Sequence, residues 1–346
     1  MDNALYRPEP ILRHRDRRVD RDTPPRRAAE RLIDGEVLLV SDRYSTGAEI
    51  IAQLEALLGS RAGDAYPARR AAERRVRTAA LRLLAPIVDH RVALEGAGAI
   101  GFLPELYPDH RSFALPFVQV QELHGAWRRY RDGVNLTVLG YKVHPYFGTY
   151  APVRTEHLEL FGTWLSQYEG PRERAIDVGT GCGVLALMLC KAGFQRVLAT
   201  DDNPNAVESV ERERERLVMP IDARCCDLLG HGSRPVELVV FNPPWMQGAV
   251  EGAIDGALYF EDPALFERFF TQAHERIAPD GRVVLLFSNV MQLVQPDVQH
   301  PILAELERGR FRLVQKLQRK AKATPGRDGR RRKTREKVEV WELARL

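Results

Sequence analysis

The stretch AIDVGTGCG at residues 175–183 decides how this chain folds. It ends a predicted strand at residues 174–178 and opens an apolar helix at residues 184–192. Its three glycines stand at alternate positions, where they let the backbone turn tightly and approach a ligand without a Cβ atom in the way. A glycine-rich turn between a strand and a helix is typical of open α/β sheets, which bind ligands at the carboxyl ends of their strands.

The residues around this turn indicate a cationic ligand that carries a ribose. Dinucleotide-binding turns read G-x-G-x-x-G and cradle a pyrophosphate, whereas this turn reads G-x-G-x-G and follows Asp177, whose carboxylate would repel a diphosphate. The next predicted strand ends at Asp201 and Asp202, where an acid can accept hydrogen bonds from both ribose hydroxyls. The turn therefore favours S-adenosylmethionine over NAD as the cofactor, with a plain structural turn as the alternative.

Strands and helices alternate from about residue 170 onward. The predicted strands cover residues 174–178, 196–200, 223–227, 236–241 and 282–287, and the predicted helices cover residues 184–192, 204–217 and 263–277. This order predicts a mainly parallel sheet with helices on both faces.

A second motif, Asn242-Pro243-Pro244-Trp245, follows the buried strand predicted at residues 236–241. A planar substrate nitrogen is a poor nucleophile because its lone pair is delocalised. The Asn242 amide oxygen and the Pro243 carbonyl can accept hydrogen bonds from such an N–H₂ group, and the two prolines stiffen the loop that presents these acceptors. Trp245 offers a flat surface on which the planar group can stack. A turn followed by a core tryptophan is the alternative.

The two motifs together resemble the class I S-adenosylmethionine-dependent amino-methyltransferases. Within them, the Asn-Pro-Pro-aromatic group is the most similar; it includes adenine N6 and guanine N2 methyltransferases of nucleic acids and release-factor glutamine methyltransferases. The resemblance covers residues 144–346 and implies a Rossmann-like sheet of seven strands whose last strand is antiparallel. Residues 311–317 and 338–343 fit the final two strands. Trp245 stands where Tyr or Phe is common in the group.

The resemblance also implies roles for single residues. Asp177 is expected to bind the cofactor, and the residues that would wrap its methionine part are Gly179, Thr180, Gly181 and Gly183. Asp201 would hold the ribose, with Asp202 as the alternative, and Asp227 would bind the adenine amino group. Asn242 would touch both the methionine end of the cofactor and the acceptor nitrogen.

An aromatic segment at residues 144–154 precedes the first motif. In similar enzymes a segment here closes over the cofactor, so we expect Tyr146, Phe147 and Tyr150 to line the cofactor or acceptor pocket. A hydrophobic linker that packs on the sheet explains the same residues equally well.

The first 143 residues carry no motif that identifies a ligand. Residues 1–30 are rich in arginine, and we expect them to form a poorly ordered lead-in or a short helix. Residues 31–143 are expected to form a smaller α+β domain for substrate recognition, with a strand at 36–40 and a hairpin at 131–143. The predicted helices of this domain cover residues 46–58 and 68–87.

Composition excludes several classes of protein. A chain of 346 residues with 44% hydrophobic and 28% charged residues is long enough for about two domains and is not compositionally disordered. It has no apolar run of about 18 residues and no apolar centre of a secretory signal near its start. Its four cysteines form no CxxC pair, so neither a metal site nor a disulfide framework is expected. We expect a soluble, cytoplasmic protein.

The net charge of +4 is unevenly distributed. Residues 316–337 hold 11 Lys or Arg and 2 Asp or Glu, a local charge of +9, which leaves −5 for the rest of the chain. We expect a basic loop at residues 318–337. Its four adjacent cations are candidate contacts to the phosphates of a nucleic acid, with a solvated loop as the alternative: Arg330, Arg331, Arg332 and Lys333.

Three hypotheses for the function follow. The first is an enzyme that methylates a planar exocyclic or amide nitrogen, most plausibly on a base in RNA. The second is the same reaction on a protein glutamine or on a small metabolite. The third is a nucleic-acid-binding or scaffold protein without turnover, and the intact motifs argue against it.

Overall fold

The computed structural model divides the chain into two compact units. One unit is Arg7–Arg129, and the other is Tyr130–Leu346 together with Met1–Tyr6. The residues that the structure describes are 4–13, 17–59, 66–152, 154–250, 255–322 and 335–346. Below, the unit Arg7–Arg129 is called the amino-terminal unit and the other the carboxy-terminal unit.

The division lies earlier than the boundary expected between residues 143 and 144. The hairpin of β6 (Val134–Leu136) and β7 (Tyr141–Val143), expected in the amino-terminal domain, belongs to the carboxy-terminal unit. Leu136, Leu139 and Val143 are buried in the hydrophobic core of that unit, which explains the difference.

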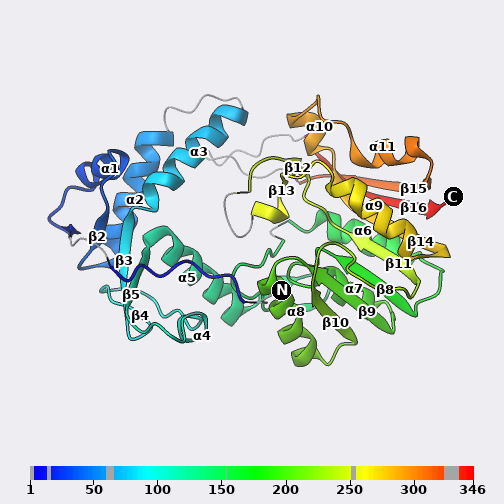
Figure 1. The fold of residues 1–346 in the computed structure, drawn as a ribbon, viewed down its shortest axis with the longest axis horizontal. Helices are drawn as coiled ribbons and strands as arrows, with labels where there is room; N and C mark the ends of the chain where they lie inside the picture. Colours follow the sequence, from blue (N-terminus) through cyan, green and yellow to red (C-terminus); the bar gives the residue numbers. More distant parts are fainter. Residues whose placement is uncertain (1–3, 14–16, 60–65, 153, 251–254, 323–334) are drawn as a thin grey trace. The chain divides into compact units, whose positions relative to one another are not determined.

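The amino-terminal unit is an α+β fold built on a five-stranded sheet (Figure 1). The strands are β1 (Arg18–Val19), β2 (Leu38–Val40), β3 (Leu83–Val88), β4 (Arg91–Val92) and β5 (Phe113–Pro116). The helices are α1 (Pro25–Ile33), α2 (Tyr44–Gly59), α3 (Tyr66–Ala80), α4 (Leu103–Leu106) and α5 (Phe117–Asp132). The central strand, β3, pairs with β2, β4 and β5.

Two details of this region differ from expectation. The helix expected to run to residue 87 ends at Ala80. The following apolar run is strand β3, which has four of its six side chains buried and pairs with β2 and β5. Of the two alternatives for the arginine-rich start, the short helix is present, since α1 begins directly after Pro24. The start is nevertheless not a separate lead-in, because β1 pairs with β2 in parallel.

The carboxy-terminal unit contains a seven-stranded sheet in the order β10-β9-β8-β11-β14-β16-β15. The strands are β8 (Arg174–Val178), β9 (Arg196–Asp201), β10 (Ile221–Cys225), β11 (Val236–Phe241), β14 (Ile277–Ser288), β15 (Phe311–Lys320) and β16 (Lys337–Arg345). The last strand in the chain, β16, runs antiparallel to both of its neighbours. The expected methyltransferase sheet, with an antiparallel last strand, is therefore confirmed.

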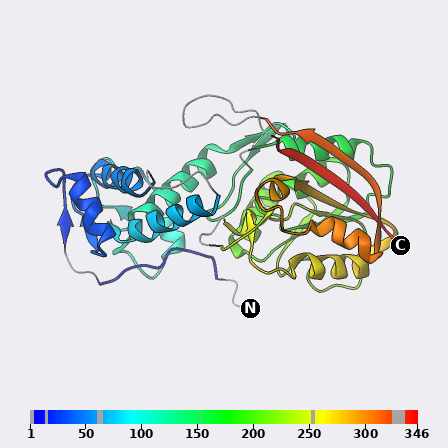
Figure 2. The same cartoon turned by 90° about the horizontal axis from the view of Figure 1, so that it is seen from above.

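Helices cover both faces of this sheet. They are α6 (Glu156–Ser166), α7 (Val184–Lys191), α8 (Pro204–Leu217), α9 (Leu265–Arg276), α10 (Val290–Val294) and α11 (Pro301–Arg308). A short parallel pair, β12 (Met246–Gln247) and β13 (Tyr259–Phe260), and the 3₁₀ turn η1 (Asp255–Ala257) lie between β11 and α9. Figures 1 and 2 show β15 and β16 as the long orange and red strands that run side by side.

Alternation along β11 shows how the two cores form. Leu238 and Val240 pack into the cluster that contains α6 and α7, whereas Val239 and Phe241 pack into the cluster that contains α9. Side chains of a strand point to opposite faces in turn, so a continuous apolar strand such as β11 must be covered on both sides. The sheet is thereby buried, and its strand ends are left to form a site.

Candidate active site

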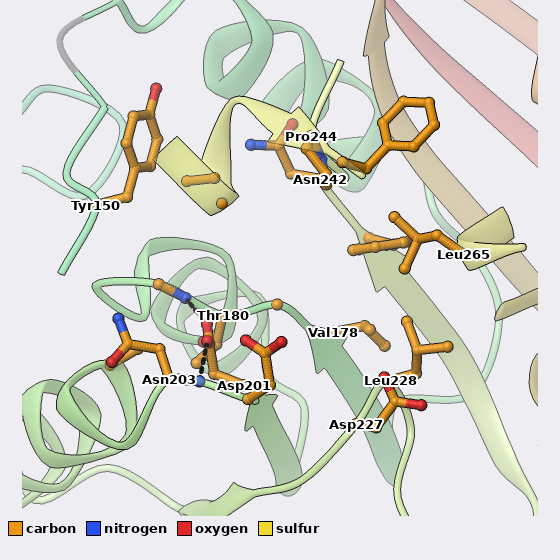
Figure 3. A pocket seen from close by; sticks show the side chains of 18 of the residues that line it. Tyr150, Val178, Thr180, Asp201, Asn203, Asp227, Leu228, Asn242, Pro244 and Leu265 are labelled. Atoms are coloured by element: carbon orange, nitrogen blue, oxygen red, sulfur yellow. Dashed lines mark hydrogen bonds between the residues drawn. The ribbon is translucent and has the colours of Figure 1, made fainter. Parts of the chain in front are cut away.

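A pocket of about 760 Å³ lies at the carboxyl ends of β8, β9 and β11 (Figure 3). Its walls include the last residues of these strands, Val178, Asp201 and Phe241. This is the edge where open α/β sheets bind their ligands, and the volume lies in the range of a small-molecule site.

The glycine turn forms one wall of the pocket and has a backbone that only glycine adopts without strain. Gly179, Gly181 and Gly183 have φ angles of 61°, 54° and 81°. A Cβ atom on Gly181 would lie 3.3 Å from the carbonyl oxygen of Tyr150, and one on Gly179 would lie 3.2 Å from the Phe241 ring. The turn therefore presents bare backbone to the pocket.

Asp177 supports the turn from behind. Its Oδ2 accepts hydrogen bonds from the Thr180 hydroxyl at 2.7 Å and from the Ala186 amide at 2.9 Å. The side chain is fully buried and is not among the pocket-lining residues. Desolvation raises the pKa of this carboxyl group to about 7. The structure thus places Asp177 beneath the loop, while Thr180 reaches the pocket wall.

Asp201 lines the pocket in a fixed orientation. Its Oδ2 accepts a hydrogen bond from the Gly181 amide at 2.9 Å and its Oδ1 accepts one from the Asn203 amide at 3.0 Å, as Figure 3 shows. Desolvation raises the pKa of Asp201 to about 6. Asp202 also lines the pocket but is exposed. The anchored carboxyl group of Asp201 is the better placed of the two to hold a ribose.

Asp227 lies on the same side of the pocket as Asp201, next to Leu228 (Figure 3). The strand expected at residues 223–227 ends two residues earlier, so Asp227 stands in the loop after β10. Its Oδ1 forms an ion pair with Arg268 at 3.3 Å.

Asn242 and Pro244 line the opposite side of the pocket, near Tyr150 (Figure 3). Trp245 does not line the pocket, contrary to its expected role as a stacking surface. Its indole packs against both hydrophobic cores, and its Nε1 donates to Asn242 Oδ1 at 3.2 Å and to the Leu286 carbonyl at 3.3 Å. The tryptophan therefore orients the Asn242 carboxamide. Pro243 is buried and also does not line the pocket.

The aromatic segment before α6 divides between the pocket and the core. Tyr150 lines the pocket, as expected. Tyr146 is buried, and the guanidinium carbon of Arg212 lies 4.3 Å from the centroid of its ring. Phe147 stacks with Tyr6, with 6.4 Å between the two ring centroids. Tyr146 and Phe147 anchor the linker on the sheet domain instead of lining the site.

Several pocket residues carry no signal that the sequence patterns above detect. They are Tyr6, His157, Asn203, Pro204, Tyr259 and Phe260. Tyr6 is far away in the sequence, and its backbone N–H and carbonyl pair with the two ends of the Asn205 side chain at 2.7 and 2.9 Å. No sequence pattern signals such a contact. Asn203 and Pro204, by contrast, form the N-cap and first turn of α8, which a capping analysis could have found.

The charge of the pocket suits a cationic cofactor. Among the described residues, five acids and one arginine line it: Asp201, Asp202, Asp227, Glu261, Asp262 and Arg268. The arginine pairs with Asp227 and Asp262. With bare backbone at the glycine turn and an anchored acid at Asp201, the pocket fits S-adenosylmethionine, which carries a sulfonium and an ammonium group.

The four candidate phosphate contacts, Arg330–Lys333, lie outside the described residues. Strand β15 continues to Lys320 and β16 begins at Lys337, so the connection begins three residues later and ends one residue earlier than the expected loop at 318–337. In the described ranges, no helix has the length and apolar character of a membrane span. No cluster of three potential metal ligands occurs in the same ranges.

Comparison with known proteins agrees with this geometry. Residues 160–306 match the Methyltransferase small domain family. The ribosomal protein L11 methyltransferase of Geobacillus kaustophilus is 26% identical over 212 residues, 55% of this chain and 61% of that protein. A Methanocaldococcus jannaschii protein, named as a candidate N5-glutamine methyltransferase, is 22% identical over 121 residues, 33% of this chain and 61% of that protein. The chain thus spans about three fifths of these relatives.

Among solved structures, the Thermus thermophilus 16S rRNA N2 G1207 methyltransferase, in complex with S-adenosylmethionine and guanosine, is 22% identical. It aligns with a TM-score of 0.35 over 56% of this chain and 44% of that protein. The carboxy-terminal unit has the sheet order and the glycine turn of the class I methyltransferase fold, and its residues 160–306 are similar to the Methyltransferase small domain. S-Adenosylmethionine is the cofactor of this class of enzyme.

Proposed function

We propose that this protein transfers the methyl group of S-adenosylmethionine to a planar nitrogen, either the exocyclic amine of a base in RNA or a side-chain carboxamide. One observation carries the proposal: the Asn242 carboxamide faces the pocket and is held by the Trp245 indole. This supports membership of the Asn-Pro-Pro-aromatic group. A cytoplasmic location and an acceptor-recognition role for the amino-terminal unit belong to the same proposal.

The proposed roles of the cofactor-side residues follow from their contacts. The Gly179–Gly183 backbone binds the methionine part, Asp201 accepts hydrogen bonds from the ribose hydroxyls, and Asp227 binds the adenine amino group. Bound S-adenosylmethionine supplies an electrophilic methyl group on a sulfonium. Because Asp201 is held by two backbone amides, little reorganisation is needed when the cofactor binds.

The acceptor-side chemistry depends on Asn242. Its Oδ1 accepts one hydrogen bond from Trp245 and keeps a second lone pair for the acceptor N–H₂ group. That hydrogen bond draws the acceptor nitrogen toward tetrahedral geometry and directs its lone pair along the line of displacement. The proton leaves to water after transfer, so no strong base is required. Orientation supplies most of the reduction in the barrier.

The basic segment favours RNA as the acceptor, because four adjacent cations at residues 330–333 match a phosphate backbone. A protein acceptor is the second candidate, favoured by the names of the relatives: ribosomal protein L11 methyltransferase and N5-glutamine methyltransferase. A small metabolite remains a third kind of acceptor for the same chemistry.

The test is transfer of a tritiated methyl group from S-adenosylmethionine into fractionated cell extract, followed by RNase or protease treatment. We expect label that RNase releases. Label that survives RNase and is removed by protease would assign a protein acceptor instead.

Asn242→Ala should lower the rate of this transfer by about 100-fold or more, because it removes a preorganised hydrogen-bond partner. Its affinity for S-adenosylmethionine, measured by calorimetry, should stay near that of the wild type. The matched control is Asn135→Ala, which removes an exposed asparagine in β6. Wild-type rates in the Asn242 variant would overturn the proposed mechanism.

A further inference from the structure

His157 carries a polar atom for which the described chain provides no partner. It is the second residue of α6, it lines the pocket, and only 3% of it is exposed. Its Nε2 is buried and makes no hydrogen bond within the described residues. Buried polar groups in folded proteins are almost always hydrogen-bonded. An unpaired imidazole nitrogen in a ligand pocket therefore indicates a ligand atom as its partner.

The imidazole of His157 is held in its neutral form. Burial lowers the pKa of His157 to about 4, although the neighbouring Glu156 carboxylate acts in the opposite direction. That carboxylate is already engaged, because it accepts a hydrogen bond from the Lys322 amide at 2.8 Å and pairs with Arg154 at 3.6 Å. A neutral imidazole has one nitrogen that donates and one that accepts.

His157 belongs to the acceptor end of the pocket. Its ring meets the Trp245 indole edge-on, with 5.5 Å between the centroids and 90° between the planes. The same indole donates to Asn242 Oδ1. Figure 3 shows Asn242 and Pro244 across the pocket from Asp201 and Asp227. One tryptophan thus connects the unpaired imidazole with the carboxamide proposed to hold the acceptor nitrogen.

We propose that His157 determines which acceptors are methylated, by hydrogen-bonding through Nε2 to a second polar atom of the acceptor group. The nitrogen to be methylated donates to Asn242 Oδ1, and the adjacent ring nitrogen or carbonyl of the same planar group pairs with His157. Two hydrogen bonds, one to Asn242 and one to His157, fix the plane and the direction of an amide-like group. An alkyl amine such as a lysine side chain has only one polar atom, so it cannot form both of these hydrogen bonds. The inference rests on the proposed function and narrows its acceptor to amide-like groups.

The experiment compares His157→Phe and His157→Gln with the wild type. Phenylalanine preserves a planar ring against Trp245 and removes both nitrogens, whereas glutamine restores polar atoms. The probes are tritiated S-adenosylmethionine and the extract fraction that the wild type labels. We expect His157→Phe to keep cofactor affinity within about twofold and to lower transfer by about tenfold or more, through a higher KM for the acceptor fraction. His157→Gln should recover part of that decrease.

His231→Phe, at an exposed histidine, is the matched control. The inference is overturned if His157→Phe transfers at the wild-type rate, or if its cofactor affinity falls in proportion to transfer. Label recovered as methylated lysine after hydrolysis of the wild-type product would also overturn it. If the wild type transfers no label to any fraction, the proposed function itself fails and this inference with it, a result that the other outcomes cannot mimic.

Discussion

Two carboxyl groups, the buried Asp177 and the partly buried Asp201, accept hydrogen bonds from residues of the glycine turn. Asp177 accepts hydrogen bonds from Thr180 and Ala186, and Asp201 accepts them from the amides of Gly181 and Asn203. The sequence pattern predicts both acids near the cofactor. It does not distinguish the acid that lies beneath the loop from the acid that lines the pocket, because that difference depends on the direction of each side chain at the strand end.

The pKa of Asp201 makes cofactor binding depend on pH. Burial raises this pKa to about 6, so the carboxyl group is charged above pH 6 and protonated below it. Protonation removes a charged acceptor for the ribose hydroxyls and a negative charge beside a cationic ligand. Affinity for S-adenosylmethionine should therefore fall by about tenfold as the pH decreases from 8 to 5, measured by calorimetry.

Asp201→Asn is the control for this pH dependence. The variant keeps the size of the side chain and cannot ionise, so its affinity should be low and nearly independent of pH. Asp177 has a pKa of about 7 and titrates in the same pH range. The variant Asp177→Asn removes this second titration, so that the pH dependence due to Asp201 can be measured alone. A wild-type affinity that is constant between pH 8 and pH 5 would contradict the role assigned to Asp201.

The sequence predicts the bounds of helices and strands well where the hydrophobic periodicity and the boundary residues agree. Strands β8 and β11 have the expected bounds because each is a short run of mostly apolar residues, and Asn242-Pro243 follows directly after β11. The apolar run of β3 follows a helix without a break in hydrophobicity, so periodicity alone extends the helix through it. The short pair β12 and β13 leaves no pattern, because side-chain contacts from Gln295 to Gln247 support it.

Tyr6, near the start of the chain, lines the pocket because contacts with residues far away in the sequence hold it there. The Asn205 side chain pairs with both backbone groups of Tyr6 and also donates to the Phe147 carbonyl at 2.8 Å. Tyr6 stacks on Phe147 and contributes to the pocket wall. Tyr6 is therefore held against α8 by the side chain of Asn205.

Tyr6→Ala should weaken S-adenosylmethionine binding by about three- to tenfold, because the substitution removes an aromatic part of the pocket wall. Tyr6→Phe retains the ring that stacks on Phe147 and should stay near the wild type. Calorimetric titration of both variants checks the expectation. Equal affinities in the alanine variant and the wild type would show that Tyr6 does not contact the cofactor.

The structure shows that part of the uneven charge of the chain is paired with acidic residues. Among the described cations of residues 316–337, three form ion pairs: Lys316 pairs with Glu339, and both Arg319 and Lys322 pair with Glu159. These cations stabilise the end of the sheet. Residues 323–334 hold five further Lys or Arg and one Asp, a local charge of +4, and they include the four adjacent cations.

The residues that flank that segment, Lys322 and Glu336, contact residues at the start of α6 and just before it. The Lys322 amide donates to Glu156 at the start of α6, and Glu336 accepts from Arg154 at 2.9 Å. His157, the next residue of α6, lines the pocket. The sequence alone does not relate the basic segment to the active site, because these hydrogen bonds join positions about 170 residues apart. Lys322 and Glu336, which flank the basic segment, are thus joined to Glu156 and Arg154, beside His157 in the sequence.

Replacing all four adjacent cations with glutamine, at Arg330, Arg331, Arg332 and Lys333, tests this arrangement. Transfer to RNA should fall, and its decrease with salt should become less steep by about 0.7 in logarithmic slope for each phosphate that is no longer bound. Cofactor affinity should not change, because the proposed cofactor contacts, Asp201 and the glycine turn, lie elsewhere in the chain. A matched variant that neutralises four exposed arginines of the amino-terminal unit, Arg17, Arg18, Arg26 and Arg27, controls for overall charge. If both variants show the same salt dependence as the wild type, phosphate binding by the basic segment is wrong, and the protein acceptor becomes the stronger candidate.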